Sequence, residues 1–175
     1  MQIELIDERN FLESFSKEWE DFRLDSKNLQ KCKNFIDYLE SIATYLIINY
    51  EKGGKIKKKL FIELILTNDT SIRTINNDFL QKDYATDVLS FPLEIVEGLK
   101  TKQCFGSIII NTNEAINKSI ENRHSIYVEL AILFIHAFLH LLGFNHENDS
   151  GQHRAIERKA IDFFELKVGL IDRNL

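Results

Sequence analysis

Residues 128–146 read VELAILFIHAFLHLLGFNH, an apolar run that carries three histidines. The apolar part, residues 128–142, has the length of a helix and predicts a helix in the core. His136 and His140 are four residues apart, so they lie on the same face of this helix, about 5–6 Å apart at Cβ. Gly143 can leave the helix in a left-handed conformation, which lets the chain fold back and bring His146 towards the other two. We expect the three imidazoles to share one site.

Three imidazoles at this spacing predict a metal centre. Neutral imidazole suits zinc, and three protein ligands with an open fourth position are the catalytic arrangement. The pattern H-x-x-x-H-x-x-G-x-x-H has the spacing of the metzincin proteases, except that Ala137 replaces their Glu general base. Histidines that merely pack in a core are disfavoured, because three buried imidazoles would each need a hydrogen-bond partner. The sequence therefore predicts a metzincin-like zinc site on a core helix, with no base beside the first histidine.

The histidine segment resembles the motif of the YbeY family of endoribonucleases, H-G-x-L-H-L-x-G-Y-D-H. A second segment, INNDFLQKDYATDVLSFP at residues 75–92, is similar to that family's L-N-x-x-Y-R-x-x-D-x-x-T-D-V-L-S-F-P. A third and weaker one, FGSIII at residues 105–110, is similar to its L-G-D-I-x-I strand. The resemblance covers about the last two thirds of the chain.

This resemblance implies a zinc-dependent endoribonuclease that is selective for single strands. It would act in ribosomal RNA maturation, at the 3′ end of the small-subunit RNA, and in ribosome quality control. The implied partners are single-stranded or ribosomal RNA and the ribosome or its small subunit, and the implied cofactor is one Zn²⁺ per chain held by His136, His140 and His146. The zinc would lower the pKa of bound water towards ~7 and offset charge on a phosphoryl oxygen. Whether water or the ribose 2′-hydroxyl attacks is left open.

Three positions depart from the family's pattern, and they support an alternative. Leu80 stands where the family carries an Arg thought to face RNA, and Ser107 and Asn145 each replace an Asp. These changes favour a non-catalytic ribosome assembly factor with a structural zinc. The metzincin spacing favours a zinc peptidase, which Ala137 opposes because no Glu beside the first histidine can accept a proton from water.

Other polar residues are weaker candidates for the site. Glu129 lies seven residues before His136, on nearly the same helix face, so it is a weak catalytic candidate that could orient a ligand or accept a proton. A solvated or capping Glu is an equally good interpretation. His124 and His153 fall outside the motif spacing, and we expect surface or helix-terminal residues there, outside the site.

Basic residues near two turns are candidates for RNA contact. Lys82 lies within the second family-like segment, and a lysine run next to Gly53-Gly54 contains Lys57, Lys58 and Lys59. A charge run beside a turn is more often only solvated. Asp83, Thr86, Asp87 and Ser90 match the same family segment, and we expect them to support the cleft through turn chemistry.

Composition is compatible with one domain over residues 1–175. The chain is 44% hydrophobic and can bury a core, and its net charge of −5 means that any RNA contact must come from a local basic patch. Cys32 and Cys104 form no C-x-x-C pair, so we expect buried structural thiols in a reducing cytoplasm. The N-terminus lacks a signal pattern, and no apolar run reaches about 18 residues, so we expect a soluble protein without membrane contact. Oligomeric state cannot be predicted.

Hydrophobic periodicity predicts an α+β fold, with helices packed against a small mixed β-sheet. The expected strands cover residues 3–5, 60–66, 88–93 and 105–110, and Pro92 predicts that the third strand is at an edge or ends early. The expected helices cover residues 27–50, 69–79, 112–122, 126–142 and 152–168. Asn68 and Asn111 are expected to cap two of them. In the last helix, the side chains expected to face the core are those of Ala155, Ile156, Ala160, Ile161 and Phe164.

Overall fold

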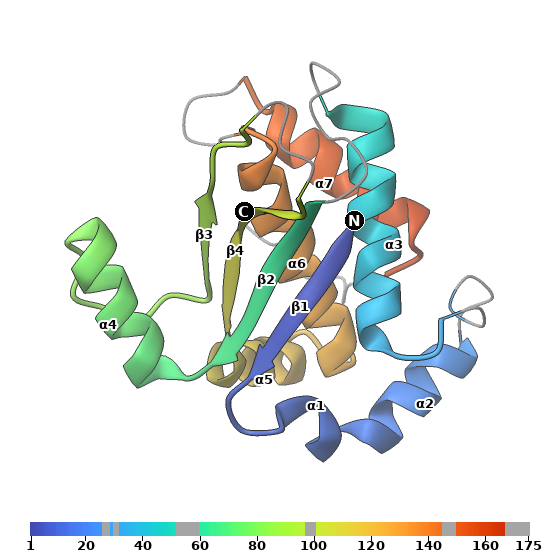
Figure 1. Ribbon diagram of the computed structural model, residues 1–175. Coiled ribbons are helices and arrows are strands. Elements are labelled where there is room, and N and C mark those ends of the chain that lie inside the picture. The colour runs from blue at the N-terminus through green and yellow to red at the C-terminus, as the bar shows by residue number, and fades with distance from the viewer. Residues whose placement is uncertain (26–28, 30–31, 52–59, 97–100, 145–149, 167–175) are drawn as a thin grey trace.

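The computed structural model describes residues 1–25, 29, 32–51, 60–96, 101–144 and 150–166 (Figure 1). These residues contain a four-stranded sheet with the order β1-β2-β4-β3. The strands are β1 (Gln2–Asp7), β2 (Leu60–Thr67), β3 (Val88–Pro92) and β4 (Gln103–Asn111). β1, β2 and β4 run parallel, and β3 pairs antiparallel with β4. The sheet is therefore small and mixed, as predicted.

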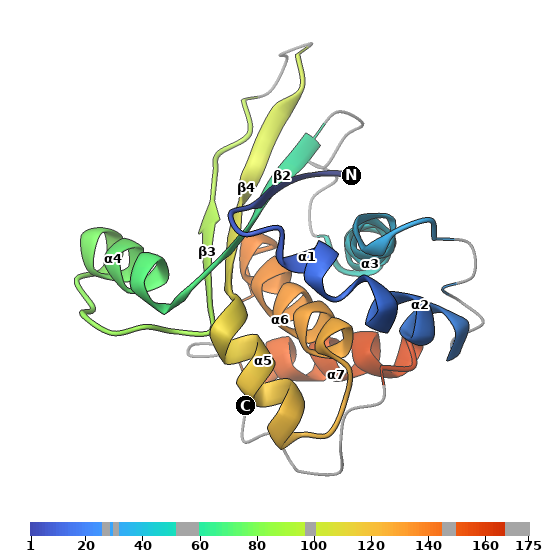
Figure 2. The ribbon, with the colours of Figure 1, turned by 90° about the horizontal axis from the view of Figure 1, so that it is seen from below.

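Helices cover both faces of this sheet unequally (Figure 2). The single helix α4 (Asp69–Leu80) lies on one side, while α1 (Phe11–Ser14), α2 (Ser16–Asp25), α3 (Phe35–Tyr50), α6 (Ile126–Leu141) and α7 (Gln152–Phe163) lie on the other. α5 (Thr112–Glu121) follows β4 and packs against α6. The expected α+β class is confirmed.

The alternation of side chains along β2 divides the core into two layers. Ile62, Leu64 and Leu66 belong to the main core, which also contains the buried residues of α3 and α6. Ile65 points to the opposite face and packs against the smaller cluster of Ile72, Leu89 and Ile109, beneath α4. Strand residues that are apolar on both faces belong to a sheet that is covered on both sides.

Most predicted elements form close to their expected bounds. Asn68 caps α4 by accepting hydrogen bonds from the backbone N–H groups of Thr70 and Ser71, at 2.9 and 3.2 Å. Asn111 caps α5 in the same way. β3 is an edge strand in the observed order, as Pro92 predicted.

Three predictions about the helices need correction. The helix expected from residue 27 begins at Phe35, because Asn34 caps it and accepts a 2.9 Å hydrogen bond from the Asp37 N–H. α1 and α2 were not predicted, although Trp19 of α2 is buried against aromatic neighbours. The last helix ends at Phe163 within the described residues, and its Ala155 is exposed rather than inward.

Gly106 permits close packing between the sheet and α6. A Cβ added there would lie 2.7 Å from the Phe91 carbonyl oxygen and 2.8 Å from Cδ2 of Leu141. Leu141 directly follows His140, so the absence of a side chain on β4 brings the carboxyl end of α6 against the sheet.

Two further expectations concern the cysteines and membranes. Cys32 and Cys104 are free thiols, but both are half-buried rather than buried, and burial raises the pKa of each. In the described part of the chain, no single helix is long and apolar enough to cross a membrane; α5 and α6 pass that test only together, by length and composition, and are bent by 118° at the break between them.

Candidate metal centre

The histidine helix α6 lies in the centre of the main core. Ser125 caps it by accepting a 3.2 Å hydrogen bond from the Tyr127 N–H, and apolar side chains then dominate its sequence. Every residue of α6 is buried except His136 and His140. A helix that is apolar all round belongs inside a protein. Its two partly exposed positions are therefore the two imidazoles.

The two imidazoles of α6 face one another. Nε2 of His136 lies 3.3 Å from Nε2 of His140, and the ring planes are tilted by 70°. Two nitrogens bound to a tetrahedral zinc at about 2.0–2.1 Å are separated by about 3.4 Å. The observed separation therefore fits two ligands of one ion.

A buried carboxylate supports the first of these imidazoles. Nδ1 of His136 lies 3.1 Å from Oε1 of Glu157, a residue of α7 that is almost fully buried. A carboxylate accepts, so Nδ1 donates and Nε2 keeps its lone pair. Ligating histidines usually donate their second ring nitrogen to such a partner, which fixes the ring's tautomer and orientation. Glu157 was not predicted from the sequence as part of the site.

The end of α6 follows the predicted geometry. Gly143 has φ +87°, in the left-handed region, and its N–H donates to the His140 carbonyl at 2.9 Å. The Phe144 N–H donates to the Leu139 carbonyl at 3.0 Å, which completes the helix terminus. The chain thus turns sharply after the second histidine. His146, the expected third ligand, lies outside the described residues, so its role as a ligand stays a prediction. Asn145 also lies outside them.

Among the described residues, the structure brings a further histidine, His153, to the pair. His153 is fully buried, and one ring nitrogen each of His136, His140 and His153 lies within 4.8 Å of the others, a grouping that could hold a metal ion. His153 is helix-terminal, as expected, but it is neither on the surface nor away from the site. The reason is that α7 packs against α6 with His153, Ile156, Glu157 and Ala160 inward.

Glu129 was considered as a neighbour of the metal ligands or as a solvated residue, but in the structure it pairs with His124. Its Oε2 lies 2.8 Å from Nε2 of His124, and both side chains are almost fully buried, with exposed fractions of 0% and 3%. His124 lies next to the helix ends in the short segment between α5 and α6, as expected, but its side chain is buried and not on the surface. The contact supports a role for Glu129 in holding the α5–α6 junction, while its catalytic role stays an untested prediction.

Of the three positions that depart from the family's pattern, the structure describes Leu80 and Ser107. Leu80 is the last residue of α4 and is 47% exposed. Ser107, on β4, donates a 2.7 Å hydrogen bond to Glu63 on β2, so its hydroxyl is used within the sheet. Among the RNA-contact candidates, Lys82 is exposed, and Lys57, Lys58 and Lys59 lie outside the described residues.

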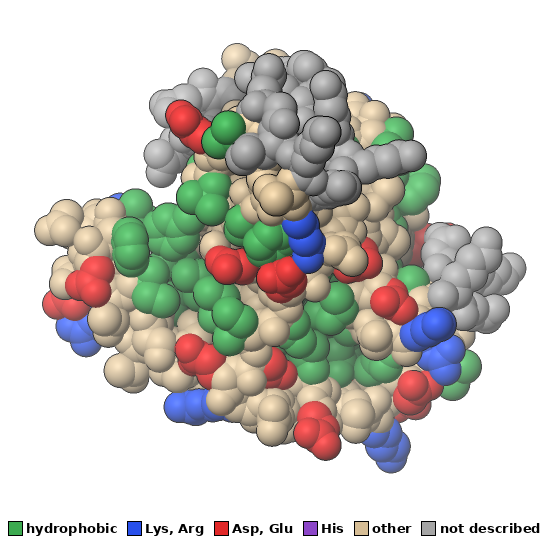
Figure 3. All heavy atoms as spheres, viewed as in Figure 1, with side chains coloured by type: hydrophobic (Ala, Val, Ile, Leu, Met, Phe, Trp, Pro, Cys, Tyr) green, Lys and Arg blue, Asp and Glu red, His purple; other side chains and the backbone are tan. Residues whose placement is uncertain are grey.

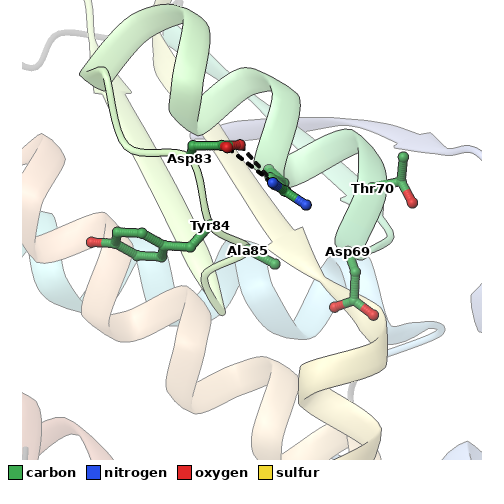
Figure 4. Close-up of a pocket in the computed structure, with 6 residues that line it drawn as sticks. Asp69, Thr70, Asp83, Tyr84 and Ala85 are labelled. Carbon is green, nitrogen blue, oxygen red and sulfur yellow. Dashed lines mark hydrogen bonds and ion pairs between the residues drawn. The ribbon is translucent and has the colours of Figure 1, made fainter.

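Asp87 makes the expected turn contacts before β3, whereas Asp83 pairs with a residue of α4. Asp83 forms a two-pronged ion pair with Arg73 of α4, at 2.7 and 2.9 Å, beside a cavity of about 450 Å³ (Figure 4). Asp87 accepts hydrogen bonds from the Thr86 hydroxyl and the Val88 N–H. The residues that line this cavity include no histidine. It is therefore separate from the metal-ligand cluster.

The α4 side of the molecule is apolar and acidic rather than basic (Figure 3). Hydrophobic side chains gather over α4 and β3, acidic ones lie over the strands, and few basic side chains are visible. Phe79 and Tyr84 are two of the exposed hydrophobic residues, with exposed fractions of 71% and 54%. The described residues on this face do not form the basic patch expected for RNA contact.

Comparisons with known proteins place this site in a family. The family model described as Endoribonuclease YbeY matches residues 25–165, which include the whole histidine segment. The chain belongs to the YbeY family of endoribonucleases. A relative from Campylobacter jejuni, named Endoribonuclease YbeY, is 43% identical over 147 residues, covering 83% of this chain and 96% of the relative. A relative of the same name from Helicobacter pylori is 46% identical over 112 residues, covering 64% and 77%.

A solved structure agrees with the fold of the YbeY family member described here. The solution structure of a protein from Thermotoga maritima matches with a TM-score of 0.50 and 20% identity, covering 99% of each chain. This likeness concerns the fold alone. The resemblance expected from the histidine segment and residues 75–92 is confirmed by the family model and the curated relatives.

Proposed function

We propose that this protein is a zinc-dependent endoribonuclease that cleaves single-stranded RNA during ribosomal RNA maturation. The observation that carries the proposal is the 3.3 Å separation of the His136 and His140 Nε2 atoms, with Glu157 behind the first ring, on the motif shared with the YbeY family. The donor set suits zinc, because neutral imidazole nitrogens are among its preferred ligands. His146 is the proposed third ligand.

Some residues of the chain would hold the ion, and others set the polarity of its surroundings. A bound zinc ion supplies a Lewis acid for a phosphoryl oxygen and a water of lowered pKa. Glu157 holds His136 in the tautomer that presents Nε2, and the apolar surroundings of α6 lower the local dielectric and strengthen interactions with charge in the cleft. The two imidazoles are partly exposed, so a phosphodiester can reach them from outside the core.

The proposed setting is the cytoplasm, with the ribosome or its small subunit as the source of substrate. The 3′ end of small-subunit RNA is the proposed cleavage region, and one domain over residues 1–175 would carry the activity. RNA is proposed to approach the partly exposed imidazoles of His136 and His140. Lys82 and the run of Lys57, Lys58 and Lys59 are proposed contacts for phosphates.

A peptidase is the competing function that shares this metal geometry. Ala137 is buried and next to His136, at the position where a metzincin protease needs its Glu base. Without that carboxylate, peptide hydrolysis lacks its proton acceptor. RNA cleavage can draw its nucleophile from zinc-bound water or from the ribose 2′-hydroxyl.

The test compares two substrates with the same zinc-loaded protein. We expect single-stranded RNA to be cleaved, casein to stay intact, and chelator to stop RNA cleavage. Metal analysis should give one zinc per chain, and His140→Ala should empty the site. Arg154→Ala, an exposed substitution on α7, serves as the matched control. Chelator-sensitive casein cleavage with intact RNA would favour the peptidase, and metal-loaded protein that cleaves neither substrate would favour the assembly factor.

A further inference from the structure

We propose that His153 is an additional ligand of the metal, so that this chain offers a fourth imidazole beside the three of the motif. The inference rests on the proposed function, because it concerns the same ion. It goes further in placing a residue of α7 in direct contact with that ion. Three observations carry it: the position of His153, its hydrogen bond and its burial.

The first observation is proximity. The His153 ring centroid lies 4.6 Å from that of His136 and 4.7 Å from that of His140, so the third ring contacts both rings of the pair. One nitrogen of each ring lies within 4.8 Å of the others. The His136–His140 separation matches two ligands on one ion, and the ring of His153 lies against both of them.

The second observation is the tautomer of His153. Its Nε2 lies 3.2 Å from the backbone carbonyl oxygen of His136. A carbonyl can only accept, so Nε2 carries the proton of the neutral ring and Nδ1 carries the lone pair. Metal-ligating histidines typically donate their second nitrogen to a carbonyl or carboxylate. His136, which donates to Glu157, and His153, which donates to a carbonyl, both follow that pattern.

The third observation is the place of His153 on its helix. The buried side of α7 consists of His153, Ile156, Glu157 and Ala160, at positions i, i+3, i+4 and i+7. The same turn therefore presents both the carboxylate that supports His136 and the imidazole beside it. His153 is 0% exposed, so its ring is enclosed between α7 and the α6 histidines.

A fourth imidazole is compatible with a catalytic zinc. Zinc in enzymes can expand from four to five ligands, so a water or substrate oxygen can still bind. His153 would then secure the ion to α7 as well as to α6. This attachment joins two helices that follow one another in the chain and pack together.

The experiment uses the full chain and zinc itself as the probe. His153→Gln is the main variant, because the Gln amide can still donate to the His136 carbonyl but supplies no imidazole lone pair. Arg154→Ala is the control on the same turn, and circular dichroism verifies that each variant is folded. Zinc affinity is measured by competition with a chelating indicator, and the visible absorption of bound cobalt(II) reports the number and type of ligands.

We expect His153→Gln to weaken zinc binding by more than about a hundredfold, which exceeds the effect usual for a residue that only supports a ligand. We also expect a changed cobalt(II) spectrum in His153→Gln and an unchanged one in Arg154→Ala. His146→Ala/His153→Gln should bind zinc more weakly than His146→Ala does.

Two results would overturn the inference. One is a His153→Gln protein whose zinc affinity and cobalt(II) spectrum equal those of Arg154→Ala. The other is equal zinc loss in His146→Ala and the double variant. Failure of the proposed function looks different, because the unsubstituted protein would then bind no zinc, or would bind it without cleaving RNA.

Discussion

Oε2 of Glu129 lies 2.8 Å from Nε2 of His124, and both side chains are buried where α5 meets α6. Glu129→Ala removes a buried carboxylate that pairs with the His124 ring, and the loss of a buried hydrogen-bond partner costs about 1–3 kcal/mol. We therefore expect the substitution to lower the free energy of unfolding by about that amount. Urea denaturation measures it, and zinc content should be unchanged.

Glu121 provides the matched control for this substitution. It is an exposed glutamate near the end of α5, paired with Lys118, and surface pairs contribute little to stability. Glu121→Ala should change the unfolding free energy by less than about 1 kcal/mol. If Glu129→Ala kept full stability but lost RNA cleavage, Glu129 would belong to the reaction instead.

Glu157 should control metal affinity through His136. Glu157→Gln keeps the side-chain size but replaces the carboxylate that accepts from Nδ1, so the imidazole becomes a weaker ligand. We expect a loss of zinc affinity of about 10–100-fold. Asp162→Asn, an exposed carboxylate-to-amide change on the same helix, should leave the affinity unchanged. Equal affinities in the two variants would contradict the role of Glu157.

Leu80→Arg should strengthen binding to single-stranded RNA. The position is half exposed at the end of α4, and the family resemblance places an Arg there. One additional phosphate contact should steepen the slope of log K against log salt by roughly 0.7 for a single strand. Binding titrations at several salt concentrations measure the slope, and zinc content should not change.

Thr74→Arg is the control for the added charge. Thr74 is an exposed residue on a different face of α4, so the variant has the same net charge without the same placement. If the two variants gain the same affinity and slope, the effect is due to overall charge and position 80 does not face RNA.

Gly106→Ala should destabilise the packing of α6 on the sheet. The added methyl would overlap the Phe91 carbonyl oxygen and the Leu141 side chain, and overpacking of this kind costs about 1–3 kcal/mol. Thermal and urea unfolding measure the loss. Gly151→Ala meets open space and suffers only from its φ of +85°, so a cost of roughly 1 kcal/mol is expected. A Gly106→Ala protein as stable as the unsubstituted chain would show that β4 and α6 can move apart.

Asp69 should make the fold more sensitive to acid. Its carboxylate accepts 2.7 Å hydrogen bonds from the side chains of Asn111 and Asn113, which lower its pKa below the usual value. A group whose pKa is lowered by folding stabilises the protein above its unfolded pKa, and this contribution is lost as the pH falls through the folded pKa. Asp69→Asn should therefore lose less stability than the unsubstituted protein between pH 6 and pH 3, as compared by urea midpoints. A parallel loss in both would contradict the assignment.

The sequence predicted the helix, the histidine pair and the turn because each depends on neighbouring residues. The apolar run fixes α6, the i, i+4 spacing brings His136 and His140 together, and Gly143 supplies the left-handed residue that ends the helix. Local spacing is sufficient for all three.

The contributions of α7 could not be predicted in the same way, since they depend on how two helices pack. Nothing in the spacing between His140 and His153 shows that their rings meet. The sequence nevertheless contained a signal. His153 and Glu157 lie on the same face of α7 as Ile156 and Ala160, so two polar residues lie on the face that packs into the core. Buried polar residues of this kind require partners, and here these partners are the ligand helix and its first histidine.

The burial of α6 leaves this helix almost no freedom to change during evolution. Packing constrains every position except two, and metal chemistry constrains those two. A drifting sequence can alter the exposed residues of α4 or α2 without disturbing either the core or the site. We expect homologous chains to diverge first along those helices, while α6 keeps both its packed volume and its histidines.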